Sequence, residues 1–258
     1  MSHHIVEAKD LRYAFPDGTE ALRGVSFRIT HGESVAVVGA NGAGKSTLLL
    51  HLNGYLAATD GSLRVGDLPV TKKTLELIRR AVGMVFQDPD DQLFMPTVFE
   101  DVAFGPINLG LPLEEVEERV SRALATVGAG HLRDRPPYRL SGGEKRSVAI
   151  ATVLSMSPDI LVMDEPTSNL DPCSRRSLIE LLRSFEHTKI LATHDLDMAV
   201  DLCERTIVLK EGRVVADGPT LDIMMDDVLL SDCRLERPLR FQACPVCGGR
   251  RGGTTNLP

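Results

Sequence analysis

The stretch Gly39–Thr47, GANGAGKST, constrains the fold of this chain more than any other part of its sequence. It matches the pattern G-x-x-x-x-G-K-[ST]. The residues 34–40, SVAVVGA, form an apolar run typical of a buried strand, and KSTLLLHLNG has a helical pattern. Because the strand, loop and helix follow one another as this pattern requires, we predict a phosphate-binding loop rather than a glycine-rich turn without function.

Each part of this loop has an expected role. Its glycines allow consecutive backbone N–H groups to face a phosphate, and the helix N-terminus adds free donors and a favourable dipole. Lys45 is expected to reach the β- and γ-phosphates of a nucleotide, and the Ser46 hydroxyl is expected to ligate Mg²⁺. The predicted nucleotide-binding residues of the loop are Gly39, Ala40, Asn41, Gly42, Ala43, Gly44, Lys45, Ser46 and Thr47.

Further apolar runs indicate an α/β fold with a largely parallel sheet. VGMVF, DILVMDE and TKILATH have the composition of buried strands, and CSRRSLIELLRSF between the last two has helical periodicity. The early segments LRYAF and LRGVSFRI alternate, as antiparallel strands do. Residues 97–155 are mostly helical in pattern. We therefore predict a P-loop NTPase core over residues 1–220, with an antiparallel β flank and a helical subdomain inserted at about 97–155.

The rest of the chain and its composition set bounds on function. Residues 221–258 are expected to form a C-terminal extension, a flexible tail. The formal net charge of −7 argues against a general nucleic-acid binder. No apolar run approaches the roughly 18 residues of a membrane span, and the N-terminus lacks the apolar centre of a signal peptide. We expect a cytosolic chain whose role at a membrane, if it has one, is peripheral, with reduced cysteines.

Two acids follow the apolar run ILVM. Asp164 is placed to hold Mg²⁺ through water, as the acid of P-loop NTPases does. Glu165, one residue further, is placed to accept a proton from an attacking water. Acids at a strand end usually belong to a solvated loop, but the upstream phosphate loop favours the catalytic interpretation.

With four further motifs, the chain resembles the ATPase subunits of ABC transporters over residues 5–220. These motifs are Gln87, LSGGE at 140–144, SNLD at 168–171 and His194. The resemblance implies ATP and Mg²⁺ as ligands and an active site divided between two chains. Gln87 would then bind Mg²⁺ and sense the γ-phosphate. His194 would bond the γ-phosphate and orient Glu165 and water.

The same resemblance assigns the signature loop to the partner's nucleotide. Ser141, Gly142 and Gly143 would close over the γ-phosphate bound by the other chain, and Asp171 would connect the two sites. A local alternative for SGGE is a helix capping box, and both can hold together. Small departures from the family pattern are Glu144, where many members have Gln, and Ser147, where a base is frequent.

The family also implies an aromatic residue that stacks on adenine. Phe15 fits the family position better than Tyr13, and ordinary packing in the sheet is the alternative for both residues.

The loop FQDPDDQLFMPTVFEDVAFGP most resembles ATPases of energy-coupling factor importers, in their cobalt/nickel branch. This implies an ATPase dimer, either a homodimer or a pair with a second ATPase, on the cytoplasmic face of the membrane. Its partners would be a transmembrane coupling protein and a substrate-binding membrane protein, with no nucleic acid. The alternatives are a vitamin or amino acid importer and a soluble ABC ATPase without a transport role. The short segment between Gln87 and LSGG argues against the soluble class.

Two further features are left open by the sequence. Phe94, Met95 and Phe99 are apolar residues in a polar loop; they either form one wall of a groove for a helix of the membrane partner or simply pack the helical subdomain. Cys244 and Cys247 have the spacing of half a zinc site, but free thiols are the favoured interpretation.

Overall fold

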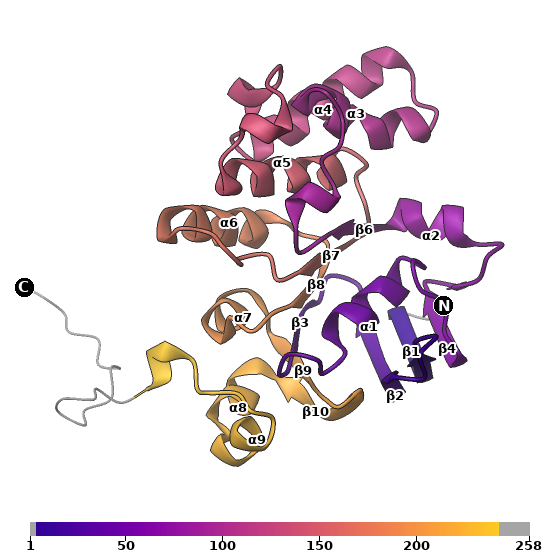
Figure 1. The fold of residues 1–258 in the computed structure, drawn as a ribbon, viewed down its shortest axis with the longest axis vertical. Coiled ribbons are helices and arrows are strands. Elements are labelled where there is room, and N and C mark those ends of the chain that lie inside the picture. Colours follow the sequence, from indigo (N-terminus) through magenta and orange to yellow (C-terminus); the bar gives the residue numbers. More distant parts are fainter. Residues whose placement is uncertain (1–3, 243–258) are drawn as a thin grey trace, which may run out of the picture.

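The computed structural model describes residues 4–242. At its centre lies a six-stranded sheet in the order β10-β9-β3-β8-β7-β6, which is parallel except for the β9–β10 pair (Figure 1). The predicted parallel core is confirmed. Its strands are β3 (Ser34–Val38), β6 (Val82–Val85), β7 (Ile160–Asp164), β8 (Thr188–Ala192), β9 (Arg205–Lys210) and β10 (Arg213–Pro219).

A second, antiparallel sheet has the order β2-β1-β4-β5, which confirms the predicted antiparallel flank. Its strands are β1 (His4–Ala14), β2 (Glu20–Thr30), β4 (Asp60–Val65) and β5 (Leu68–Pro69). Helix α1 (Lys45–Leu52) lies between the two sheets, and α2 (Leu75–Ala81) leads into β6 (Figure 1).

The central sheet divides the hydrophobic core into two halves. On β3, Val35 and Val37 pack towards α1 and the antiparallel sheet, whereas Ala36 and Val38 pack towards the other helices. Both faces are therefore apolar, which explains why the strands of this sheet are nearly continuous apolar runs. Helices α6 (Pro172–Ser184) and α7 (Leu196–Leu202) contribute to the second half of the core.

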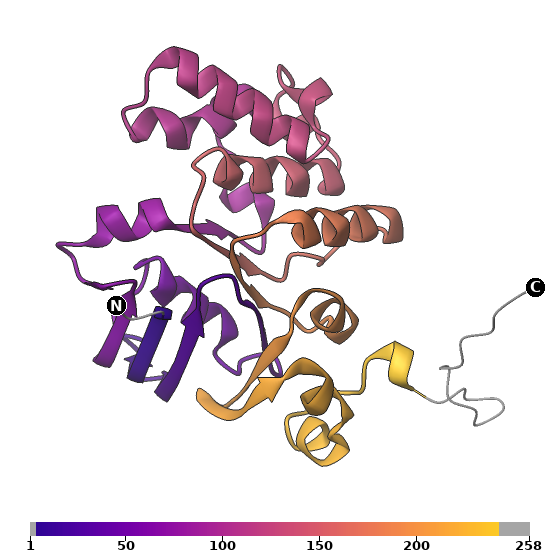
Figure 2. The ribbon, with the colours of Figure 1, turned by 180° about the vertical axis from the view of Figure 1, so that it is seen from behind.

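The inserted stretch folds into α3 (Val98–Asn108), α4 (Leu113–Thr126) and α5 (Gly142–Leu154), which form a helical layer at one end of the molecule (Figure 2). Their apolar faces pack on one another and continue into the core beside the sheet. Helix α5 begins with the predicted capping box: Ser141 Oγ accepts from the Glu144 N–H at 3.3 Å, and Glu144 Oε2 accepts from the Ser141 N–H at 2.7 Å.

The expectation of a flexible tail from residue 221 is wrong for residues 221–242. Helices α8 (Thr220–Met225) and α9 (Asp227–Asp232) are folded there, and Ile223, Met224, Leu230 and Cys233 are buried in the core. Two aspartates of this segment have structural partners. Asp226 caps α9 by accepting from the Leu229 N–H at 2.9 Å, and Asp232 pairs with Lys210 at 2.6 Å.

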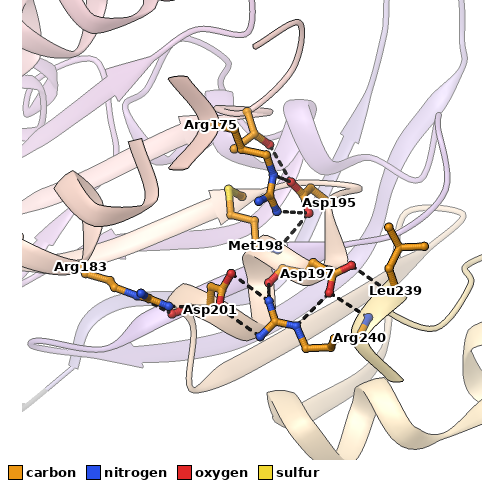
Figure 3. A network of polar contacts seen from close by, with 9 residues as sticks. Arg175, Arg183, Asp195, Asp197, Met198, Asp201, Leu239 and Arg240 are labelled. Atoms are coloured by element: carbon orange, nitrogen blue, oxygen red, sulfur yellow. Dashed lines mark hydrogen bonds and ion pairs between the residues drawn. The ribbon is translucent and has the colours of Figure 1, made fainter. Parts of the chain in front are cut away.

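An ion-pair network joins this C-terminal segment to α7. Arg240 Nε lies 2.9 Å from Asp197 Oδ1, and its Nη2 lies 2.9 Å from Asp201 Oδ2 (Figure 3). Asp201 also pairs with Arg183 of α6, and Asp197 accepts from the Leu239 N–H at 2.7 Å. The segment is thus fixed by charge as well as by apolar contacts.

Within residues 4–242 no helix combines the length and apolar character needed to cross a bilayer. The same residues contain no group of three or more His, Cys, Asp or Glu side chains able to hold a metal ion. Cys244 and Cys247 lie outside the described residues.

Candidate nucleotide-binding site

Four parallel strands end at the same edge of the central sheet and bring the predicted residues together. The phosphate loop follows β3, Gln87 follows β6, Glu165 follows β7 and His194 follows β8. They line one cavity of about 670 Å³, within the size range of roughly 300–1,000 Å³ usual for ligand sites. The lining comprises Phe15, Thr19, Glu20, Ala21, Gly39, Ala40, Asn41, Gly42, Gly44, Lys45, Ser46, Thr47, Gln87, Glu165, His194, Arg234 and Leu235.

The phosphate loop needs glycine for close backbone contact. Gly44 has φ 103°, and a Cβ added there would lie 2.7 Å from the Ala21 carbonyl oxygen. Ala43, a residue of this loop, is buried and does not line the cavity. Lys45 is 7% exposed, and its Nζ donates to the carbonyls of Gly39 at 2.8 Å and Ala40 at 3.3 Å. The ammonium is therefore held across the mouth of the loop, where a phosphate chain would lie.

The acid pair lies beside the loop. Asp164 is buried, and its Oδ1 has no hydrogen-bond partner among the described residues. Burial raises the pKa of this carboxyl, while a hydrogen bond with Ser46 acts in the opposite direction. A buried carboxylate oxygen without a partner, next to a hydroxyl, is a donor set that suits Mg²⁺. Asp164 and Ser46 would hold the ion; Ser46 and Gln87 line the cavity, and Asp164 is not among its lining residues. Bound there, Mg²⁺ would neutralise charge on the phosphates.

Glu165 is held by its neighbours in an uncommon conformation. Its φ is 46°, a left-handed value that is unusual for a residue with a side chain, and its N–H donates to the Ala192 carbonyl at 2.8 Å. Oε2 lies 2.7 Å from His194 Nδ1 and accepts from the His194 N–H at 3.2 Å, while Oε1 lies 3.9 Å from Lys45 Nζ. The carboxylate, imidazole and ammonium thus meet in one place. Strain of this kind often accompanies a catalytic position.

The structure distinguishes the two aromatic candidates. Phe15 is 39% exposed and lines the cavity. Tyr13 is half-buried, packs edge-on against His51 at a ring distance of 4.9 Å, and is absent from the lining. Phe15 is therefore the aromatic face available to a base.

Gln87 is held through its backbone by α5, a contact that the sequence analysis missed. Arg146 is 3% exposed, and it donates to the carbonyls of Phe86 at 2.8 Å and Gln87 at 2.6 Å. Gln92 adds a second link, because its Nε2 donates to the Ala149 carbonyl at 2.8 Å and its Oε1 accepts from the Phe86 N–H at 3.2 Å. Arg146 directly follows Lys145 and precedes the apolar run of α5, so no sequence pattern marked it as the residue that holds this loop.

The signature residues lie apart from this cavity. Ser141 and Gly143 line a different hollow between α5 and α6, and Gly142 lines a third beside Gln87. Asp171 caps α6, accepting from the N–H groups of Cys173 at 2.9 Å and Ser174 at 3.0 Å. These bonds hold the pKa of Asp171 below its usual range. Within one chain, then, neither the signature loop nor Asp171 lines the cavity of the phosphate loop.

The sequence profile of the ABC transporter family matches residues 22–168, which is more than half of the chain. The chain belongs to the ABC transporter family. The matched residues include the phosphate loop, Gln87, the signature loop and the acid pair. As a member of this family, the chain is an ATPase.

Individual relatives agree with this assignment. A protein of Geobacter sulfurreducens, itself named only provisionally as an ABC transporter ATP-binding protein, is 73% identical over 248 residues, covering 96% of this chain and all of the relative. The energy-coupling factor transporter ATP-binding protein EcfA of Methanocaldococcus jannaschii is 45% identical, covering 91% of this chain and 86% of the relative. The latter similarity places this ABC ATPase in the energy-coupling factor group.

Among solved structures, CbiO1 of Clostridium perfringens, part of the ABC transporter complex CbiONQ, is similar to this chain. Its TM-score is 0.79 at 39% identity, with 90% of this chain and 94% of CbiO1 covered. The predicted fold of an ABC ATPase with an antiparallel sheet and a helical subdomain is therefore confirmed.

Proposed function

We propose that this ABC ATPase powers an importer of the energy-coupling factor type that takes up Co²⁺ or Ni²⁺. In this proposal it lies peripherally on the cytoplasmic face of the membrane. The observation that carries the transport role is an apolar groove beside the Gln87 loop, suited to a helix of a membrane partner. The alternative is import of a vitamin or an amino acid by the same kind of complex.

Hydrolysis would use the residues gathered at the sheet edge. Lys45 and the loop N–H groups bind the phosphate chain, and Phe15 offers a face to adenine. Glu165 accepts a proton from the attacking water, and the Nδ1 contact of 2.7 Å lets His194 fix the orientation of that carboxylate. The protein forms no covalent intermediate in this scheme, because catalysis of phosphoryl transfer depends mainly on positioning the reactants and neutralising the charge on the phosphates.

The site would be completed by a second ATPase chain. The N-cap Ser141 and Gly142 are exposed and Gly143 is half-buried at the start of α5, where a hydroxyl, the N–H groups of the first turn and the helix dipole suit an anion. These groups do not line their own chain's cavity, so they are free to close over the γ-phosphate held by a partner. A homodimer satisfies this requirement with one kind of chain, and Asp171 would lie where the two sites communicate.

The groove lies between α2, α3 and α5 and has a volume of about 720 Å³. Phe94 and Phe104 form an edge-to-face pair on its wall, with ring centroids 5.1 Å apart, and they are 63% and 44% exposed. Exposed aromatic rings in a groove suit the apolar face of an amphipathic helix. Phe99 packs under Arg133 instead, at 4.1 Å, and neither it nor Met95 lines the groove.

Movement at the nucleotide could reach this groove through a short path. Gln92 lines the groove and bonds both Phe86 and α5, and the N–H groups of Phe94 and Met95 donate to Asp101 of α3, each at 3.0 Å. The loop that carries Gln87 at one end thus carries a wall of the groove at the other. This continuity supports a role in coupling hydrolysis to a membrane partner.

The proposed cargo rests on the resemblance of the loop after Gln87 to the cobalt/nickel branch of these ATPases. No contact in the structure can identify the cargo, because the ATPase need not touch the transported ion. The test is uptake into vesicles that contain this chain, its transmembrane coupling protein and the substrate-binding protein. ATP-dependent uptake of Co²⁺ or Ni²⁺, abolished by Glu165→Gln in this chain, is the expected result. ATP-driven uptake of a vitamin or an amino acid without metal uptake would overturn the proposal of Co²⁺ or Ni²⁺ as cargo but not the proposal that this chain is the ATPase of an importer. No ATP-driven uptake of any of these would overturn the transport role.

A further inference from the structure

Two residues of the nucleotide cavity come from the C-terminal segment rather than from a family motif. These are Arg234 and Leu235, which follow α9. We infer that Arg234 is a nucleotide-contacting residue whose guanidinium binds the phosphate chain of ATP. This inference rests on the proposal that the cavity holds the nucleotide, and it assigns the segment 220–242 a role in the site.

The backbone at Arg234 has a conformation that usually belongs to glycine. Its φ is 54°, directly after the end of α9, and the turn is closed by the Leu235 N–H, which donates to the Leu230 carbonyl at 2.8 Å. A left-handed residue with a side chain costs roughly 1–2 kcal/mol, which is why glycine is preferred at this place after a helix. An arginine kept in a glycine position, at the edge of a ligand cavity, points to a use for its side chain.

The segment is rigid enough to present this side chain. Cys233 is 2% exposed in the core on one side of Arg234, and Leu235 packs against the same core on the other. Asp232 is paired with Lys210, which ends β9. Arg240 is fixed by Asp197 and Asp201 of α7, as Figure 3 shows. The positions before and after Arg234 are therefore fixed to the body of the protein.

Charge supports a phosphate as the ligand. The neighbouring arginines of the segment are used in ion pairs, Arg237 with Asp227 and Arg240 with two aspartates. Arg234 is exposed, and no ion pair joins it to any residue in the range 4–242. Lys45 and Arg234 are the Lys and Arg residues of the cavity lining as the structure describes it, and Glu20 and Glu165 are its acidic residues. A guanidinium presents paired donors that match phosphate oxygens.

The test measures binding of ATP, ADP and adenosine to the full chain by calorimetry. Arg234→Asn and Arg234→Gly both suit the left-handed backbone, so each removes the guanidinium without adding strain. We expect each to weaken ATP binding by about 10- to 100-fold, the effect of one charge-assisted hydrogen bond or more, and to leave adenosine binding unchanged. Arg234→Lys should restore part of the affinity. Arg213→Asn, which removes an exposed arginine of β10 outside the cavity, is the matched control and should bind ATP as the wild type does.

Lys45→Ala separates the two ways in which the experiment can fail. If Lys45→Ala weakens ATP binding and the Arg234 variants do not, the inference about Arg234 is overturned while the site stands. If the Arg234 variants weaken adenosine as much as ATP, the guanidinium does not act on the phosphates, which also overturns it. If Lys45→Ala has no effect on ATP binding, the cavity itself is not the nucleotide site.

Discussion

Replacing Arg146 by methionine tests the link between the signature helix and the Gln87 loop. Arg146 is 3% exposed, and its guanidinium donates to the carbonyls of Phe86 and Gln87 at 2.8 and 2.6 Å. Methionine keeps much of the apolar volume and leaves both carbonyls without this donor. Burial lowers the pKa of Arg146, which indicates that the protein bears a desolvation cost for keeping the cation there.

The expected loss in the free energy of unfolding is the difference between the lost hydrogen bonds and the relieved cost of desolvation. Two hydrogen bonds from a charged donor are worth about 1.5–3 kcal/mol each, and the relief of desolvation cancels part of the sum, which leaves a net loss of about 2–4 kcal/mol. For a chain of this size that corresponds to a melting temperature lower by about 5–15 °C. Turnover at saturating ATP should also fall, by about tenfold or more, because Gln87 is no longer held in place.

The assays are thermal unfolding and steady-state ATP hydrolysis. Lys145→Met is the matched control: it removes the neighbouring cation of α5, whose ion pair with Asp90 is solvent-facing at 2.6 Å and worth about 0–1 kcal/mol. A melting temperature of Arg146→Met within about 2 °C of the control's would refute the energetic argument. An unchanged turnover would refute the role of Arg146 in positioning Gln87.

Three further outcomes are expected. Glu165→Gln should bind ATP normally and lose about 10²–10⁴-fold in hydrolysis; near-normal hydrolysis would remove Glu165 as the base. Phe94→Ala should weaken pull-down of the transmembrane coupling protein with ATP affinity unchanged, and equal capture of the variant and the wild type would rule out the groove. Burial raises the pKa of the Asp101 carboxyl in the folded protein above its ordinary value of 3.8. The stabilisation that comes from protonating this carboxyl is therefore fully present below pH 3.8 and is lost as the pH rises through the folded-state pKa. In urea unfolding at a series of pH values, Asp101→Asn should therefore show a smaller loss of stability over that interval, and an identical pH slope would contradict this.

The sequence was sufficient to predict the site residues that directly follow the strands of the parallel sheet. Parallel strands place their carboxyl ends at one edge, so the residues after four apolar runs could be expected to meet, and Lys45, Gln87, Glu165 and His194 do line one cavity. The capping box at Ser141 was also predictable, because it depends on residues three apart.

Residues whose role depends on long-range packing were not predictable. Arg146 donates to two backbone carbonyls about 60 positions away in the sequence. Because any residue has a backbone carbonyl, this contact leaves no recognisable pattern of residue types in the sequence. The order of residues 221–242 was not predictable, because the pairing of Asp232 with Lys210 and the burial of Leu230 and Cys233 arise only when the segment folds against the rest of the protein. Arg234 enters the cavity through that same folded segment. The choice between Phe15 and Tyr13 likewise required the packing of Tyr13 on His51.

The central claim is that each nucleotide is enclosed between two chains. The most direct measurement is the molar mass in solution of Glu165→Gln with ATP and Mg²⁺, by light scattering after size exclusion. This variant should form a dimer with ATP and remain a monomer with ADP, and adding Ser141→Arg to it should abolish the dimer while the isolated chain still binds ATP. A dimer that persists with Ser141→Arg, or no ATP-dependent dimer in Glu165→Gln, would contradict a site completed by the partner's signature loop.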